Sequence, residues 1–255
     1  MVKIATPISH LFENNKYAKE IIMYSDCLEC RDNSFGSTLS KQELFHCEFQ
    51  PIHKLTESNF KYLENLKKNK HNLKLLTFHA ASSCDRPYVK NRMFQKRGSE
   101  YTEREALRNA KINFRRIRSI FNQKIGIAIE NANYYPTKAY KYITDASFIS
   151  RIVKENNVNL VFDIAHARIT AHNKGIDYEA YRNSLPLDKA IQIHLSSFKV
   201  LRSNLAYDAH DYPKAREFAE AKRLLKNCSL KYLTVEYYKN IRCLLRSLKL
   251  LRGLI

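Results

Sequence analysis

The sequence predicts an α/β fold, a parallel (β/α)8 barrel. Its length of 255 residues fits one such barrel, which usually takes about 250 residues. Eight short apolar runs recur along the chain, and helical patterns occupy most of the intervals between them. This repeated strand-then-helix order is typical of a parallel barrel. A doubly wound open sheet is the alternative, but it usually carries a glycine-rich turn after its first strand, and this chain has none.

The expected strands are short, mostly continuous apolar runs. Strands of a parallel barrel are buried on both faces, so they lose the usual alternation of polar and apolar residues. They cover residues 2–7, 20–26, 43–50, 73–80, 125–131, 160–166, 190–197 and 231–238. No stretch has the composition of a linker, so we expect a single TIM-barrel domain over residues 1–255.

The expected helices are marked by capping residues and prolines. Thr102 and Glu105 form a capping box that begins a helix extending to about Phe121. Asp145 can cap a helix in the same way, and Pro213 suits the first turn of another. Further helices are expected over residues 146–157, 177–184, 213–227 and 238–255.

The composition limits the class of protein and suggests its partners. An apolar fraction of 44% and only 5 glycines exclude disorder along the whole chain and collagen-like repeats. The net charge of +19 favours acidic partners, such as an anionic peptide, nucleic acid or a phosphorylated substrate. No apolar run has the length of a signal peptide or a membrane span, and the six cysteines form no compact framework. We therefore expect a cytoplasmic protein with reduced thiols and no membrane association.

The longest irregular stretch covers residues 82–101, after the fourth expected strand. Long loops that follow barrel strands lie on the catalytic face. This stretch is basic and is predicted either to be solvated or to clamp a substrate. Its cations are Arg86, Lys90, Arg92, Lys96 and Arg97.

Nine imidazole and carboxylate side chains lie at or just after the expected strands. They are His46, His79, Glu130, Asp163, His166, His194, Asp208, His210 and Glu236. Carboxylates inside apolar runs, such as Glu130 and Asp163, are costly to bury unless they are paired or bind a metal. Because barrel strands converge at one mouth, we expect these nine side chains to share one cavity.

This set of ligands predicts a multinuclear metal centre. Imidazole together with carboxylate suits zinc, iron or manganese, and nine ligands are enough for about two or three ions. Glu130 and Glu236 would be natural bridges between them. The lone Cys27-x-x-Cys30 pair has no second pair, so a zinc ribbon is not indicated.

The order His, His, Glu, Asp-x-x-His, His, Asp-x-His, Glu resembles the metal ligands of the xylose isomerase-like TIM-barrel superfamily. The local sequence around Asp163 and His166, the stretch 173–178 and the Leu185-Pro186 pair before the His194 strand are most similar to one branch of it. That branch is the multinuclear non-heme iron-dependent oxidative enzymes. Endonuclease IV is the nearest rival, but it usually continues its histidine strand with Asn-Asp-Ser, where this chain has Leu195-Ser196-Ser197.

The resemblance implies an O2-using enzyme that modifies a residue, in most cases cysteine, of a ribosomally made peptide. All nine residues would be metal ligands, His194, Asp208 and Glu236 would be catalytic, and about two or three iron ions would be the cofactor. The basic loop with Arg104 and Arg108 would hold an acidic peptide, and a separate partner protein would bind the leader peptide. Two alternatives stay open: a zinc phosphodiesterase acting on abasic DNA, and a sugar isomerase or epimerase that uses one divalent ion, such as manganese.

Overall fold

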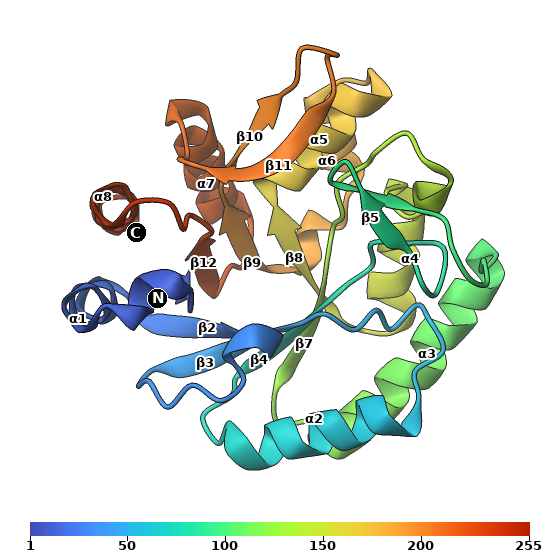
Figure 1. The fold of residues 1–255 in the computed structure, drawn as a ribbon, viewed down its shortest axis with the longest axis horizontal. Coiled ribbons are helices and arrows are strands. Elements are labelled where there is room, and N and C mark those ends of the chain that lie inside the picture. The colour runs from blue at the N-terminus through green and yellow to red at the C-terminus, as the bar shows by residue number, and fades with distance from the viewer.

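Eight parallel strands form a closed barrel in the computed structural model, which describes residues 1–255 (Figure 1). Around the barrel their order is β1, β12, β9, β8, β7, β4, β3 and β2. Their bounds are β1 Lys3–Pro7, β2 Cys27–Arg31, β3 Gln42–Cys47, β4 Leu75–His79, β7 Gly126–Glu130, β8 Asn159–Asp163, β9 Ala190–Leu195 and β12 Tyr232–Val235. The predicted (β/α)8 fold is confirmed.

Eight helices cover the outside of the barrel. They are α1 Asn15–Tyr24, α2 Glu57–Asn69, α3 Glu103–Ile120, α4 Ala146–Glu155, α5 Ile164–Lys174, α6 Tyr178–Ser184, α7 Ala215–Asn227 and α8 Ile241–Arg252. The predicted capping box is present at α3, where Thr102 accepts from the Glu105 N–H and the Glu105 side chain accepts from the Thr102 N–H. Between β2 and β3 the chain makes only a short 3-10 turn, Asp32–Ser34. None of the helices is long and apolar enough to cross a membrane.

The prediction of a strand over residues 20–26 was wrong. Those residues are mostly the last turns of α1, which Asn14 caps by accepting from two backbone N–H groups. Ala18 and Ile21 are the buried residues of α1, at the spacing of one helical face. The second strand is Cys27–Arg31, whose charged residues conceal it from a search for apolar runs.

Alternation along the strands explains why polar side chains gather at one end of the barrel. One buried residue from each strand contributes to a cluster formed by Ala5, Cys27, Leu44, Leu75, Ala128, Val161, Ile191 and Tyr232. Side chains two residues apart on a strand point to the same face. Two positions after Cys27, Leu44, Ala128 and Val161 stand Glu29, His46, Glu130 and Asp163. The apolar cluster therefore lies beneath a polar one.

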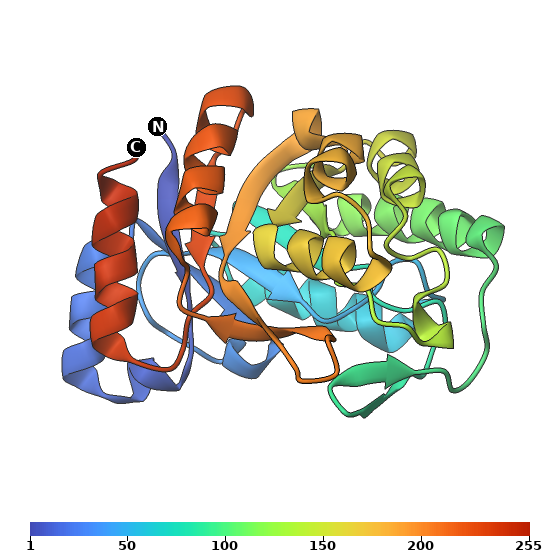
Figure 2. The ribbon, with the colours of Figure 1, turned by 90° about the horizontal axis from the view of Figure 1, so that it is seen from above.

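Two hairpins extend the carboxyl end of the barrel and lie near each other in Figure 2. The first joins β5 (Tyr88–Lys90) to β6 (Met93–Gln95), within the stretch that the sequence left irregular. The second joins β10 (Ser197–Val200) to β11 (Ala206–Asp211). The Arg92 guanidinium lies over the Tyr207 ring, 4.8 Å from its centroid, and so connects the two hairpins.

The six cysteines are all free. Cys27 belongs to the apolar cluster of the eight strands, whereas Cys30 packs in the larger core with the helices. The two thiols of the Cys-x-x-Cys motif therefore lie in separate environments, although both are buried.

Candidate metal centre

The nine predicted residues come together at the carboxyl end of the barrel in three connected groups. The first group is His46, His79 and Glu130. The Nε2 atoms of the two histidines face each other at 2.8 Å, and a Glu130 carboxylate oxygen lies 3.5 Å from His46 Nε2 and 3.2 Å from His79 Nδ1. Three donor atoms from neighbouring strands β3, β4 and β7 thus surround one point.

The second group is Glu130, Asp163, His194 and Glu236, all buried, with donor atoms within 4.8 Å of one another. His194 Nδ1 lies 2.7 Å from Glu130 Oε1 and 3.4 Å from Glu236 Oε1. Glu130 belongs to both groups: its Oε2 faces His46 and His79, and its Oε1 faces His194. Its carboxylate could therefore contact two adjacent metal ions.

The third group is His166, Asp208 and His210. Asp208 Oδ2 lies 3.5 Å from His166 Nε2 and 3.2 Å from His210 Nε2. His210 Nε2 also lies 3.5 Å from Glu236 Oε2, so Glu236 connects this group to the second. His166 lies on α5, whereas Asp208 and His210 lie on β11. The predicted loop after the seventh barrel strand, β9, is therefore the second strand of a hairpin.

Hydrogen bonds fix the two residues of the Asp-x-x-His motif with one donor atom of each free for a metal. Asp163 Oδ1 accepts from the His166 N–H at 2.6 Å and so caps α5, while Asp163 Oδ2 is buried and has no hydrogen-bond partner. His166 Nδ1 lies 2.9 Å from the Asn131 carbonyl oxygen, which fits an N–H donor there. Such a bond leaves Nε2 as the acceptor that faces Asp208. An orphaned buried carboxylate oxygen among imidazoles is what a site for a divalent cation provides.

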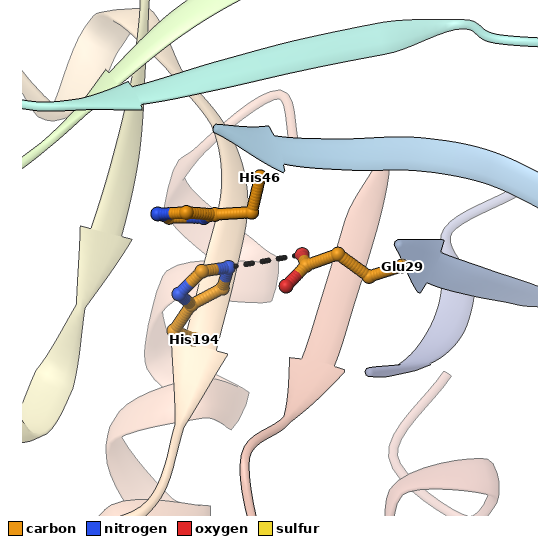
Figure 3. A group of neighbouring side chains, drawn as sticks. All are labelled: Glu29, His46 and His194. Atoms are coloured by element: carbon orange, nitrogen blue, oxygen red, sulfur yellow. Dashed lines mark hydrogen bonds and ion pairs between the residues drawn. The ribbon is translucent and has the colours of Figure 1, made fainter. Parts of the chain in front are cut away.

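Glu29 and Arg31 belong to the same cluster and were missed in the sequence, because both lie on the misplaced second strand. Glu29 Oε2 lies 3.2 Å from His194 Nε2, and Figure 3 shows Glu29, His46 and His194 converging from three strands. Arg31 donates to Glu29 at 3.1 Å and also pairs with Glu236. The period of two after Cys27 is the signal that could have identified them.

Several buried carboxylates lie close together in this cluster, and they shift the pKa values of their neighbours. Burial raises the pKa of Asp163 to about 6. Burial opposes the charge of His194, yet Glu29 and Glu130 raise its pKa to about 9. Burial and the neighbouring His79 hold the pKa of His46 well below its ordinary value. Protons on imidazoles thus offset part of the negative charge, and bound divalent cations would displace them.

Two hollows open beside this cluster. One, of about 300 Å³, has His79, His166 and Asp208 in its wall. The other, of about 960 Å³, has Arg31 and Tyr238 in its wall. The predicted clamp residues Arg104 and Arg108 line neither hollow; they border a groove that also contains residues of α4.

Solved structures with the same fold cover nearly the whole chain. The 3-keto-D-glucoside 4-epimerase of E. coli is 14% identical, with a TM-score of 0.58 over 100% of this chain and 99% of that one. A xylose isomerase-like TIM-barrel protein of Mycobacterium smegmatis, solved in complex with magnesium, is 11% identical, with a TM-score of 0.59 over 100% and 98%. These likenesses agree with the predicted TIM-barrel fold, and several of the similar structures are xylose isomerase-like barrels.

Several sequence relatives are UPF0276 proteins, each matched over part of its length. A UPF0276 protein of Acaryochloris marina is 30% identical over 87 residues, 34% of this chain and 31% of the relative. A UPF0276 protein of Vibrio parahaemolyticus is 27% identical over 94 residues, 36% of this chain and 33% of the relative. The matched stretches thus span about a third of these relatives. Residues 56–242 match the family described as RiPP precursor modification enzyme MbnB/TglH/ChrH, where RiPP denotes a ribosomally synthesised and post-translationally modified peptide. The chain belongs to this family of RiPP precursor modification enzymes.

Proposed function

We propose that this protein is a multinuclear iron enzyme that uses O2 to oxidise a residue, cysteine first, of a ribosomally made peptide. The observation that carries the proposal is the convergence of nine ligands in three connected groups, in a chain of this family. Reduction of one O2 to two molecules of water takes four electrons and four protons, and the peptide, oxidised by four electrons, would supply both.

The residues divide naturally among the ions that they would hold. His46, His79 and Glu130 would hold one, Asp163, His194 and Glu236 would share Glu130 to hold a second, and the third group would hold another. The third group is His166, Asp208 and His210. When bound, about two or three iron ions would supply the redox chemistry that no side chain of the cluster can.

The side chains of this chain bind and orient the reactants. Deep in the barrel, Gln192 donates to Glu29 Oε2 at 2.7 Å and also to the Thr234 hydroxyl, which holds Glu29 in place beside His194. The smaller hollow would admit the reacting residue of a peptide and its neighbour beside His79 and Asp208. The apolar and aromatic part of its wall would exclude water from that side of the reacting group. Its apolar lining is Ala81, Val89, Phe94, Ala132, Tyr135 and Tyr140.

The family match favours an acidic peptide over nucleic acid as the partner of the positive charge. An excess of 44 basic over 25 acidic residues attracts such a peptide from a distance. A separate protein that captures the leader peptide is part of the proposal, and it is supported by the match to this family of peptide-modifying enzymes.

Metal content is the experiment that tests the proposal. The full chain is purified without oxygen and without added metal, and its metals are measured by mass spectrometry. About two or three irons per chain, with O2 uptake that requires a cysteine-containing precursor peptide, would support it. About three zincs would favour phosphodiester cleavage, and one manganese would favour sugar isomerisation; either result would reject the iron proposal.

A further inference from the structure

The smaller hollow beside the candidate metal centre has a cation in its wall that pairs with no carboxylate. Arg92 lines this hollow together with His79, His166 and Asp208. Two other cations of the same segment are engaged with carboxylates: Lys96 pairs with Glu100, and Arg86 lies 3.7 Å from Asp85. Arg97 contacts the Arg86 carbonyl oxygen and the Tyr88 ring. Arg92 forms no ion pair, and its guanidinium is held over the Tyr207 ring instead. A cation in such a position is free to meet an anion from outside the chain.

The backbone at Arg92 is unfavourable for an arginine. Asn91 and Arg92 form the two-residue turn of the β5–β6 hairpin, with φ of 51° and 66°. In such a turn the second position is normally glycine, because a side chain in this left-handed conformation is sterically unfavourable. An arginine at a position that suits glycine suggests a role for its side chain.

Neutral donors accompany Arg92 in the same wall. Gln50 Oε1 accepts from the backbone N–H groups of Ala81 and Ser82 at 2.8 and 3.0 Å, which leaves its amide N–H groups unengaged. The Tyr135 hydroxyl oxygen accepts from the Asp208 N–H at 3.2 Å, so its own O–H remains available to a ligand. Two acidic groups also face the hollow, Glu48 at its rim and Asp208 among the metal ligands.

We propose that Arg92, with Gln50 and Tyr135, binds a carboxylate of the peptide substrate next to the residue that is modified. The inference rests on the proposed peptide modification and deepens it by naming the charge that the site selects. A volume of about 300 Å³ accepts a fragment of roughly two residues, not a folded peptide. The carboxylate belongs either to an adjacent Asp or Glu side chain or to the carboxyl terminus of the peptide; both present the same chemistry to a guanidinium.

Four short peptides test the proposal and distinguish the two sources. They are acetyl-Gly-Cys-Asp-amide, its Asn counterpart, acetyl-Gly-Cys with a free carboxyl terminus, and its amide. Binding to the anaerobically purified protein is measured by calorimetry. We expect one carboxylate peptide, or both, to bind about tenfold or more tightly than the neutral counterpart. Arg92→Gln should reduce this ratio to about one, whereas Lys90→Gln, in the same hairpin, should preserve it.

Arg92→Gly separates binding from folding. This variant removes the guanidinium and relieves the backbone conformation, so its Tm should not fall even though the contact with Tyr207 is lost. Its preference for a carboxylate should disappear. Equal binding of charged and neutral peptides to the wild type, a preference that survives in Arg92→Gly, or no binding of any peptide would each overturn the subsite. The iron measurement stands apart from these results: peptide binding without charge preference would leave the proposed function intact.

Discussion

Replacing Glu29 by Gln tests whether this residue orients His194 for metal binding. His194 Nδ1 faces the carboxylates of Glu130 and Glu236, and its Nε2 faces Glu29 at 3.2 Å. An Nε2–H that donates to Glu29 leaves Nδ1 unprotonated toward the metal and makes it a stronger ligand. Glu29→Gln preserves the size of the side chain and an acceptor oxygen but removes the charge.

The expected size of the effect follows from that contact. Changing an outer partner of a metal-bound histidine typically lowers metal affinity by about 10–100-fold, which corresponds to about 1.4–2.7 kcal/mol. Glu29→Ala would be less informative, because it would take one acceptor away from each of the buried donors Gln192 and Arg31. Each such loss costs about 1–3 kcal/mol of folding stability.

The assay titrates metal-free protein with iron(II) in a chelator buffer under argon and measures bound metal by mass spectrometry. Glu64→Gln, at an exposed position of α2, is the matched control and should bind like the wild type. The Tm of metal-free Glu29→Gln should lie close to that of the wild type. Metal affinity within twofold of the wild type would show that Glu29 does not orient His194.

Three further variants probe the fold and the centre. Asp26→Asn should lower the free energy of unfolding by about 1–2 kcal/mol at pH 7, because Asp26 accepts two hydrogen bonds from Arg252 at 2.9 Å each and one from the Ile4 N–H. Partial burial opposes the charge of Asp26, but these hydrogen bonds lower its pKa. The difference in the free energy of unfolding between variant and wild type should therefore vanish as the pH falls below about 3.9 and Asp26 becomes protonated. Urea unfolding at pH 7 and at low pH measures this difference. Thr102→Ala should cost about 1 kcal/mol in the same assay, since the α3 cap is lost. Asp163→Asn should lose metal but stabilise the metal-free protein by about 1–2 kcal/mol, because it relieves repulsion among buried carboxylates.

Two of these variants have a matched control. Asp188→Asn changes an exposed aspartate that forms no ion pair and should leave unfolding unaltered at both pH values. Thr102→Ser should restore the cap of α3. A metal-free Asp163→Asn protein that is less stable than the wild type would contradict the repulsion argument.

Most of the fold could be predicted because it depends on local patterns. Seven of the eight barrel strands overlap the apolar runs, and the capping box placed α3 correctly. The second strand was misplaced because Ile21 and Ile22 resemble a strand core, whereas Cys27–Arg31 carries two charges. These two charges pair with each other and with His194 and Glu236 from distant parts of the chain. Such compensation is a tertiary property, absent from any window of the sequence.

The same limit applies to the site. Histidines and carboxylates that end apolar strands could be identified singly, and the structure brings all nine together. The proposed role of Arg92 could not be predicted, because it depends on a two-residue turn and on Tyr207, more than a hundred residues later in the chain. The basic stretch 82–101 predicted either a solvated loop or a clamp, and the turn geometry and the place of Arg92 in the hollow come only from the structure.

The apolar cluster beneath the metal ligands seals one end of the barrel. Eight buried side chains, one from each strand, occupy that end, so whatever reaches the centre must come from the side of the two hairpins. Metal, peptide and product would therefore all enter and leave at this end of the barrel, where both hollows open. A seated peptide would cover the ions beneath it and slow their exchange with solvent. A chelator should then remove the metal slowly while peptide is bound and quickly once the peptide has left.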